Sequence, residues 1–375
     1  MNIEVLGIGI PNKGAELMLL ALMEKIRDKY PKARFVLPAL NHDYEQRMFL
    51  GTYQKFALRV AGIDLGFVGN WIPTRLKHKY GVISDGEIDV IIDASGFAYG
   101  DQWGSKKLLQ RLGKVSKWKR QGKKVIALPQ ALGPFTSEGF EQACREVFPN
   151  VDLLFARDSI SYKHAAAYTS DNLFQFGDFT NLATPEQATS AFAENADVCI
   201  IPNTKMLQMN DQAQGHRYIE CMIALTRSMI EKNRKPFFLV HEGKGDRELA
   251  EQIRDAVDSN IPLLDPKDAL EIKRIIGASS IVISSRFHGL VSALSQGVPV
   301  IATGWSHKYQ MLLKDYHCEE LLIGLDDDNS WRACVEAVTN QEQFTAYKGV
   351  ISRQAKTLKH ETEAMWAKVF ELLAR

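Results

Sequence analysis

Short apolar runs alternate with longer segments of helical periodicity through most of this chain. The runs are continuous rather than alternating, which is typical of strands buried on both faces of a parallel sheet that helices cover. The predicted strands are residues 3–7, 34–38, 90–93, 124–129, 153–156, 198–202, 236–241, 281–284 and 298–302. The predicted helices include residues 15–30, 218–232, 248–258, 269–278 and 290–296. This β-α-β-α order predicts an α/β fold.

The length of the chain and one change in its pattern predict two domains. At 375 residues the chain is too long for one ordinary core. Periodicity is lost in the polar segment 177–186. We therefore expect Rossmann-like domains at residues 1–180 and 181–345, and a C-terminal helix at 346–375 that packs back on the first domain.

The composition is that of a soluble protein without a strong charge preference. A formal net charge of +1 gives no global attraction to nucleic acid or membrane. The five cysteines are scattered and form no C-x-x-C pair, which argues against a zinc cluster and for a reducing compartment. The first residues lack a basic region followed by an apolar core, and no apolar run has the length of a membrane span. We expect a cytoplasmic protein.

The segment Ser285-Arg286-Phe287-His288 joins the predicted strand 281–284 to a helix-like segment. A helix start offers backbone N–H groups and the positive end of the helix dipole, which both favour an anion. Arg286 adds a fork of donors that fits carboxylate or phosphate oxygens, and a bound anion would favour the charged form of His288. The pattern predicts a site for a small, multiply charged, phosphorylated ligand. The alternative is an arginine that caps the sheet edge and a histidine satisfied in the core.

Two further cations follow predicted strands. Lys308 comes after the strand 298–302, and Arg157 comes after the strand 153–156. Open α/β sheets bind ligands at the carboxyl ends of their strands, so Lys308 is placed to reach the same anion and Arg157 to close on it from the other domain. The alternatives are a solvated lysine and a surface ion pair that contributes little.

Asp93, Ser95 and Gly96 lie at the end of the predicted strand 90–93. A carboxylate in this place can accept a proton from a hydroxyl nucleophile, and Gly96 permits close approach of the backbone. The alternative for Asp93 is a helix cap.

Two motifs that suggest a cofactor or a metal are better explained otherwise. The loop after the first strand begins like a dinucleotide fingerprint, but Asn12 replaces its third glycine, so we predict no nicotinamide or flavin. We expect this loop to line a cleft with Asn12 and Glu16. The acidic run 326–328 precedes a helix-like segment and is explained as a capped helix start, so no metal site is predicted there.

The segment Lys106–Lys124 is rich in Lys and Arg, contains no acidic residue and has apolar residues interleaved, Trp118 among them. A basic amphipathic helix of this kind can rest on an anionic membrane surface. The alternative, an exposed helix whose apolar stripe faces the sheet, fits equally well. No nucleic-acid-binding module accompanies the segment, so nucleic-acid binding is not indicated.

Together these motifs resemble the polysaccharide pyruvyl transferase family. The residues that carry the resemblance are Ser285–Gly289, Ala293, Gly297–Ile301 and Lys308, with weaker signatures at Pro129–Pro134, Ala156–Asp158 and Asn12–Glu16. The resemblance implies a GT-B-like α/β fold in which two Rossmann-like domains face a central cleft.

The resemblance also implies an activity. Members transfer the carboxyethylidene group of phosphoenolpyruvate to two hydroxyls of a sugar residue, here in a glycan or a lipid-linked saccharide precursor, and release phosphate. Phosphoenolpyruvate is then a co-substrate, and neither a cofactor nor a metal is expected. The family's motifs carry donor binding onto Arg157, Arg286 and His288, and the full expected donor set is Arg157, Ser285, Arg286, Phe287, His288 and Lys308.

The implied chemistry assigns further roles. Protonation of the donor's methylene carbon makes C2 electron-poor, a sugar hydroxyl attacks it, phosphate departs, and a second hydroxyl closes the ketal ring. We expect His288 to be the general acid or a phosphate partner, with Asp93 as the base and Arg286 and Arg157 clamping the donor. The expected acceptor-binding residues are Asn12, Glu16, Asp93, Ser95 and Gly96.

The sequence departs from the family pattern on the acceptor side. Ala94-Ser95 stands where a glycine pair is common, and Ala15 stands where an acidic residue is frequent. These departures leave the acceptor sugar as the least determined part of the assignment.

Two other functions stay open from the sequence. One is a GT-B nucleotide-sugar glycosyltransferase, but such enzymes usually place a ribose-binding glutamate after the strand matching 298–302, where this chain has Lys308 and no glutamate before Glu319. The other is a non-catalytic protein that binds polyanions or partners through Lys106–Lys124. The same basic segment would also allow a cytoplasmic enzyme to make peripheral contact with the inner face of the membrane.

Overall fold

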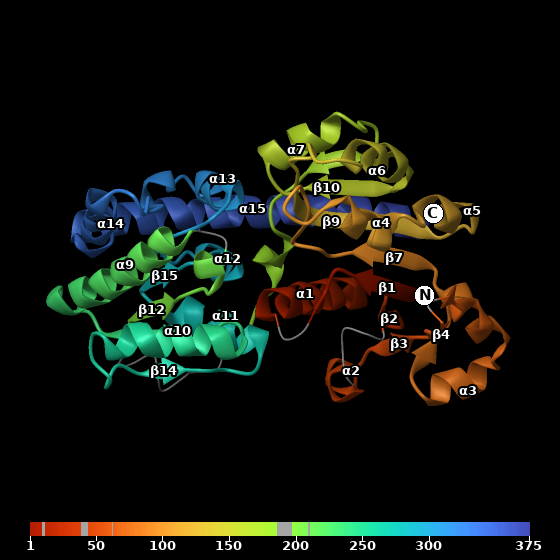
Figure 1. Ribbon diagram of the computed structural model, residues 1–375, viewed down its shortest axis with the longest axis horizontal. Helices are drawn as coiled ribbons and strands as arrows, with labels where there is room; N and C mark the ends of the chain where they lie inside the picture. Colours follow the sequence, from red (N-terminus) through yellow and green to blue (C-terminus); the bar gives the residue numbers. More distant parts are fainter. Residues whose placement is uncertain (10–11, 39–43, 62, 186–196, 209–210) are drawn as a thin grey trace. The chain divides into compact units, whose positions relative to one another are not determined.

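The computed structural model describes residues 1–9, 12–38, 44–61, 63–185, 197–208 and 211–375. They form two compact α/β units (Figure 1). Unit 1 contains the described residues of 1–10, 18–179 and 362–375, and unit 2 contains those of 11–17 and 180–361.

Unit 1 is built on a parallel sheet. Its strands are β1 (Asn2–Leu6), β2 (Arg34–Leu37), β3 (Tyr53–Lys55), β6 (Val82–Ile83), β7 (Val90–Asp93), β8 (Phe97–Tyr99), β9 (Lys124–Leu132), β10 (Leu153–Ala156) and β11 (Leu173–Gln175). The strand order is β11-β10-β9-β7-β1-β2-β3-β6, with β8 paired to β9, while β4 (Arg59–Val60) and β5 (Ile63–Asp64) form a separate antiparallel pair. After β1 the chain adds strands on one side and then returns to add β7 on the other, so the topology switches between β1 and β7.

Helices cover the sheet of unit 1. They are α1 (Lys13–Lys29), α2 (Tyr44–Leu50), α3 (Thr74–Lys79), α4 (Ser105–Leu112), α5 (Val115–Arg120), α6 (Phe140–Val147) and α7 (Ser159–Ala166), with the 3-10 turns η1 (Gly66–Trp71), η2 (Asp85–Glu87) and η3 (Phe148–Asn150). The 3-10 turn η4 (Phe179–Leu182) begins in unit 1, and its remaining residues belong to unit 2. The first turn of α1 belongs to unit 2. Strand residues such as Ile91 and Val125 share one buried cluster with Trp118 and Phe140 of the helices, so the core lies between sheet and helices.

Unit 2 has a smaller parallel sheet of the order β14-β13-β12-β15-β16. Its strands are β12 (Val198–Ile201), β13 (Pro236–Leu239), β14 (Leu263–Leu264), β15 (Ile281–Ser284) and β16 (Val300–Ala302). Its helices are α8 (Lys205–Gln208), α9 (Gln212–Glu231), α10 (Gly243–Asp255), α11 (Ala269–Ala278), α12 (Phe287–Leu294), α13 (His307–Asp315), α14 (Asp328–Thr339) and most of α15 (Gln341–Ala374), with the turn η5 (Glu319–Leu321). The topology switches between the central strand β12 and β15.

The last turns of α15 group with unit 1. Trp366 is 1% exposed there. Its ring lies 6.3 Å from that of Phe179 and 5.7 Å from that of Phe370. Phe370 also contacts Tyr30 of unit 1, with 6.2 Å between ring centroids. Aromatic packing thus joins the end of the chain to the core of unit 1.

The α/β fold predicted from the sequence is confirmed. Every predicted strand is present, with ends that shift by a few residues. The strands that the sequence did not reveal, such as β3, β6 and β14, are two or three residues long. In the described part of the chain, no helix combines the length and the apolar character that crossing a bilayer requires.

The burial of Trp366 leads to a stability prediction. Trp366→Ala removes a buried ring and leaves a cavity, so we expect it to lower the free energy of unfolding by about 3–5 kcal/mol. Trp71 is 76% exposed, and Trp71→Ala should change it by no more than about 0.5 kcal/mol. Urea denaturation followed by circular dichroism measures both. Equal effects of the two substitutions would contradict the packing of α15 described here.

Candidate functional site

The carboxyl ends of β12, β13, β15 and β16 lie along one edge of the sheet in unit 2, because these strands are parallel. The segments that follow them carry Asn203, Glu242, Arg286 and, in the first turn of α13, Lys308 in that strand order. Arg286 stands directly at the switch between β12 and β15, where open α/β sheets bind ligands. The predicted anion site therefore coincides with the switch point of unit 2.

Arg286 is buried and paired with two carboxylates. It is 8% exposed, its Nη2 donates to Asp246 Oδ1 at 2.5 Å, and its Nη1 donates to Glu242. Burial opposes the charge of Arg286, but Asp246 and Glu242 outweigh it and raise the pKa of the guanidinium. Asp246 is itself held by the backbone N–H and the hydroxyl of Thr204, each at 3.1 Å. Arg286 is therefore a permanent cation in a fixed place.

Ser285 fixes the turn that carries Arg286. Its hydroxyl lies 2.7 Å from the hydroxyl of Tyr218 and 2.6 Å from that of Thr303. Its carbonyl accepts hydrogen bonds from Asn203 Nδ2 at 2.8 Å and from the Tyr309 hydroxyl at 3.1 Å. Ser285 is completely buried. Its described contacts hold the backbone between β15 and α12.

His288 lies in the first turn of α12 and packs tightly against the start of α1. A Cβ atom added to Gly14 would lie only 2.2 Å from His288 Nδ1. Only glycine permits this approach, because any side chain would displace the imidazole. The glycine of the Asn12–Glu16 segment is thus a packing surface for the histidine.

Asn12 and Glu16, expected on the acceptor side, lie in unit 2 beside these groups. Asn12 Nδ2 donates to Glu242 Oε1 at 3.0 Å, so it contacts a carboxylate that also binds Arg286. Glu16 is buried, pairs with Lys13 Nζ at 2.6 Å and accepts from the backbone N–H of Ala269 at 3.3 Å. Their described contacts tie the start of α1 to the anion site.

Lys308 is in the first turn of α13, and aromatic rings surround its ammonium. Nζ lies 4.9 Å from the ring centroid of Trp305, 5.2 Å from that of Phe287 and 5.3 Å from that of Tyr309. Cation–π attraction holds a lysine in such a place. Phe287 directly follows Arg286 in the chain. Because the ammonium of Lys308 lies over the ring of Phe287, it lies close to the turn that carries Arg286.

Three groups of this site were not predicted from the sequence: His241, Glu242 and Asp246. Burial, with the charges of Arg286, His288 and Lys13, lowers the pKa of His241 well below its ordinary value, so its imidazole is neutral at pH 7. One feature of the sequence could have revealed the first two of these groups. His241-Glu242 come shortly after the strand β13, just as Ser285-Arg286 come after the strand β15.

The switch point of unit 1 holds the predicted residues Asp93, Ser95 and Gly96. Asp93 is 0% exposed, and its carboxylate accepts from the hydroxyls of Ser95 at 2.6 Å and Tyr99 at 2.7 Å, with Gln130 Nε2 at 3.4 Å. Burial and the charge of Asp93 raise the pKa of Tyr99 well above its ordinary value. Ser95 also accepts from Arg111. Asp93 therefore sits in a closed network and does not cap a helix.

Arg157 follows β10 in unit 1 and is buried. Its Nη1 lies 3.3 Å from Asp178 Oδ2, and that carboxylate is buried as well. The alternative reading of Arg157 as part of a surface ion pair is therefore wrong. The adjacent Asp158 caps α7 by accepting from the backbone N–H of Ser161 at 2.7 Å.

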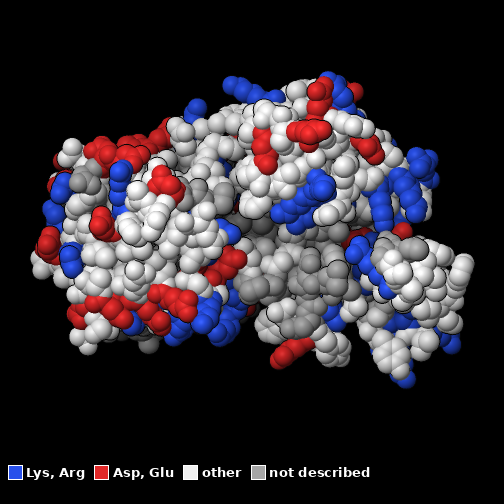
Figure 2. All heavy atoms as spheres, viewed as in Figure 1, with Lys and Arg blue, Asp and Glu red and all other residues white. Residues whose placement is uncertain are grey.

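The basic segment Lys106–Lys124 forms two helices, α4 and α5, instead of one. Leu108, Leu112, Val115 and Trp118 are buried in the core of unit 1. The exposed cations are Lys106, Lys114, Lys117, Lys119 and Arg120. On the face shown in Figure 2, basic side chains are interspersed with acidic ones. The apolar stripe faces the core, as predicted by the alternative in which this segment is an exposed helix packed on the sheet.

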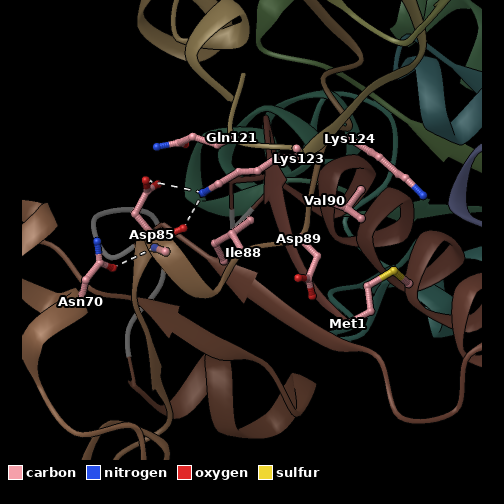
Figure 3. Close-up of a pocket in the computed structure, with 11 residues that line it drawn as sticks. Met1, Asn70, Asp85, Ile88, Asp89, Val90, Gln121, Lys123 and Lys124 are labelled. Carbon is pink, nitrogen blue, oxygen red and sulfur yellow. Dashed lines mark hydrogen bonds and ion pairs between the residues drawn. The ribbon is translucent and has the colours of Figure 1, made fainter. Parts of the chain in front are cut away.

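A cavity of about 440 Å³ in unit 1 lies at the opposite edge of the sheet, where β7 and β9 begin. Figure 3 shows Lys123 directed toward Asp85, to whose carbonyl it donates, and Lys124 directed away. Asn70 Oδ1 accepts from the backbone N–H of Gly86 at 2.8 Å, and Lys124 donates to the carbonyl of Leu373 at 3.2 Å. These lining groups are bonded within the protein, and none of the residues predicted to bind the donor lines this cavity.

The acidic run 326–328 starts a helix, as expected. The side chain of Asp327 caps α14 by accepting from the backbone N–H of Asn329 at 2.9 Å. Within the described residues, no three or more His, Cys, Asp or Glu side chains gather in a way that could hold a metal ion.

Comparison with solved structures shows the fold. The chain is similar to UDP-GlcNAc 2-epimerase from Neisseria meningitidis bound to UDP-GlcNAc, with a TM-score of 0.61 and 12% identity over 99% of this chain and 100% of that one. It is similar to MnaA of S. aureus in a structure with UDP, with a TM-score of 0.62 and 12% identity over 100% and 97%. A trehalose-6-phosphate structure from E. coli, bound with UDP-2-fluoro glucose, has a TM-score of 0.54 and 8% identity over 98% of each chain. The α/β chain with two parallel sheets is thus GT-B-like.

A family model shows the family. The model described as Polysaccharide pyruvyl transferase matches residues 12–307. This range begins at the segment packed on His288 and includes Asp93 at the end of β7, β15 and Arg286. The chain therefore belongs to the polysaccharide pyruvyl transferase family, a family of enzymes.

Proposed function

We propose that this enzyme transfers the carboxyethylidene group of phosphoenolpyruvate to two hydroxyls of one sugar residue, in a glycan or a lipid-linked saccharide precursor. The products are a cyclic pyruvate ketal and phosphate. The observation that carries the proposal is the buried, permanently charged Arg286 at the switch point of unit 2, inside the range of the family match.

The charges around Arg286 suit this donor. Phosphoenolpyruvate carries a carboxylate and a phosphate on three carbons, so it needs several cations close together. Arg286, the ammonium of Lys308 and the start of α12 supply positive groups along one sheet edge. We assign Ser285 and Phe287 to positioning these cations. Arg157 of unit 1 is the further donor ligand that the family motif implies.

The proposed reaction needs proton transfer at two places. One sugar hydroxyl adds to C2 of the donor, and its proton ends on the methylene carbon, which becomes a methyl group. The second hydroxyl then bonds to C2 as the bond to the phosphate oxygen breaks, and its proton leaves with the phosphate. We propose that His288 is the general acid or a hydrogen-bond partner of the phosphate. The imidazole of His241, which lies near Arg286, is neutral and so is not a second proton donor of the site.

Asp93 is the proposed base of the acceptor side, together with Ser95 and Gly96. Its carboxylate already accepts from Ser95, Tyr99 and Gln130. To take a proton from a sugar hydroxyl, Asp93 must exchange one of these partners for the acceptor. Asn12 and Glu16 are assigned to the donor side instead, because their described contacts are with groups of unit 2.

Localisation in the cytoplasm stays a prediction, and so does contact with the inner face of a membrane. The buried Trp118 and its apolar neighbours cannot insert into a bilayer while they form the core. Membrane contact would therefore rest on the charge of the exposed lysines of α4 and α5 alone.

The first test is donor-dependent turnover. With a panel of galactose-, glucose- and mannosamine-containing acceptors, we expect release of phosphate from phosphoenolpyruvate, and Arg286→Ala should lower kcat/KM by at least about a hundredfold. Arg217→Ala, which removes an exposed arginine paired with Asp326, should leave it within about twofold. Turnover of a UDP-sugar without phosphoenolpyruvate would instead favour a glycosyltransferase.

A second test addresses His288 through Gly14. Gly14→Ala forces the imidazole to move, so we expect kcat to fall by about a hundredfold although no reacting group is removed. Gly9→Ala, before α1, is the matched control, because no described atom lies within 4 Å of the added Cβ. Steady-state kinetics compare the two, and normal turnover of Gly14→Ala would exclude a catalytic role for the placement of His288.

A third test addresses Asp93. Asp93→Asn keeps the size of the side chain but removes the base, so we expect kcat to fall by at least about a hundredfold while the Kd for phosphoenolpyruvate stays within about twofold. Asp89→Asn, just before the same strand at its other end, should leave both unchanged. If Asp93→Asn keeps wild-type turnover, the base lies elsewhere.

A further inference from the structure

Glu242 binds Arg286 without an evident structural need. It is the N-cap residue of α10, yet its side chain makes no capping hydrogen bond and reaches Arg286 Nη1 instead. Its side chain is 27% exposed, whereas that of Asp246 is 1% exposed. Of the two carboxylates on Arg286, one is therefore locked in the core and the other can leave.

The surroundings of the two carboxylates support this difference. Asp246 accepts from both the backbone and the hydroxyl of Thr204, so its position is set without Arg286. Glu242 has one other described side-chain partner, Asn12, at 3.0 Å. A carboxylate that another anion displaces from Nη1 can keep its bond to Asn12 and turn toward solvent.

The charge balance gives a reason for displacement. Arg286 brings one positive charge against two formal negative charges, so a donor anion gains little attraction from Arg286 while Glu242 stays paired with it. Arg286 Nε, which is buried, has no hydrogen-bond partner among the described residues. A donor anion that replaces Glu242 on Nη1 leaves the guanidinium with two anionic partners, as before, and the charge of Glu242 moves toward solvent.

We propose that Glu242 occupies the place of a donor oxygen on Arg286 and sets the affinity for the donor. This inference rests on the function proposed above and adds a specificity-determining residue to it. Asp246 is the positioning residue that holds the guanidinium, and Glu242 is the exchangeable ligand. An anion must compete with Glu242 to bind, which favours a donor with more than one anionic group over a monoanion.

The test compares donor affinity in matched variants by isothermal titration with phosphoenolpyruvate. Glu242→Gln removes the competing charge at constant size, so we expect its Kd to be about tenfold lower than that of the wild type. The same substitution should tighten binding of inorganic phosphate. Glu248→Gln is the control, because Glu248 lies on the same helix, is exposed and pairs only with Lys244 among the described ion pairs. Its Kd should stay within about twofold of the wild type.

A second variant guards against a folding defect. Glu242→Ser removes the carboxylate and supplies a hydroxyl that is a good helix cap, so it should tighten binding in the same way. A structural role of Glu242 predicts the opposite sign, because loss of a partner of Arg286 would weaken binding. Unchanged or weaker binding in both folded variants overturns the inference.

The outcomes also separate this inference from the proposed function. If the wild type binds and turns over phosphoenolpyruvate but neither Glu242 variant binds it more tightly, only the role of Glu242 fails. If no form of the protein binds phosphoenolpyruvate, the proposed function fails, and the role of Glu242 as a donor competitor fails with it.

Discussion

The ion pairing of Arg286 is the interaction on which the site depends. A buried guanidinium is costly unless carboxylates or a bound anion compensate its charge. Asp246 supplies that compensation from α10, and Thr204 holds Asp246 in turn. The network of Ser285 fixes the turn from which Arg286 extends. The protein thus keeps a cation in the core of unit 2 with its charge directed to the edge of the sheet.

Topology explains why chemistry gathers at two places in the chain. Each sheet has a switch point, and at each of them a strand is followed or ended by a charged residue that was predicted from the sequence. These residues are Asp93 in unit 1 and Arg286 in unit 2. The two differ in kind. Asp93 is completely buried among hydroxyl and amide partners, whereas Arg286 contacts one carboxylate that is partly exposed. This carboxylate partner of Arg286 is thus partly open to solvent, whereas Asp93 is enclosed.

The sequence predicted those parts of the fold and site that are local. Continuous apolar runs located β7, β12 and β15, and the residues after β15 indicated the turn that carries Arg286, because strand, turn and helix start are adjacent in the chain. The pairing of Arg286 with Asp246 joins residues 40 positions apart, and Asn12 meets Glu242 over 230 positions. No periodicity reports such contacts. Because contacts distant in the sequence leave no local pattern, the sequence also did not show that Asn12 and Glu16, which were expected on the acceptor side, pack in unit 2.

A crystal structure with a non-reactive phosphoenolpyruvate analogue would show whether the donor binds at Arg286. We predict that a carboxylate or phosphate oxygen of the analogue lies within hydrogen-bond distance of Arg286, that Glu242 has left Nη1, and that Asp246 has not moved. An analogue bound away from Arg286, with the pairing of Arg286 and Glu242 intact, would mean that Arg286 does not bind the donor.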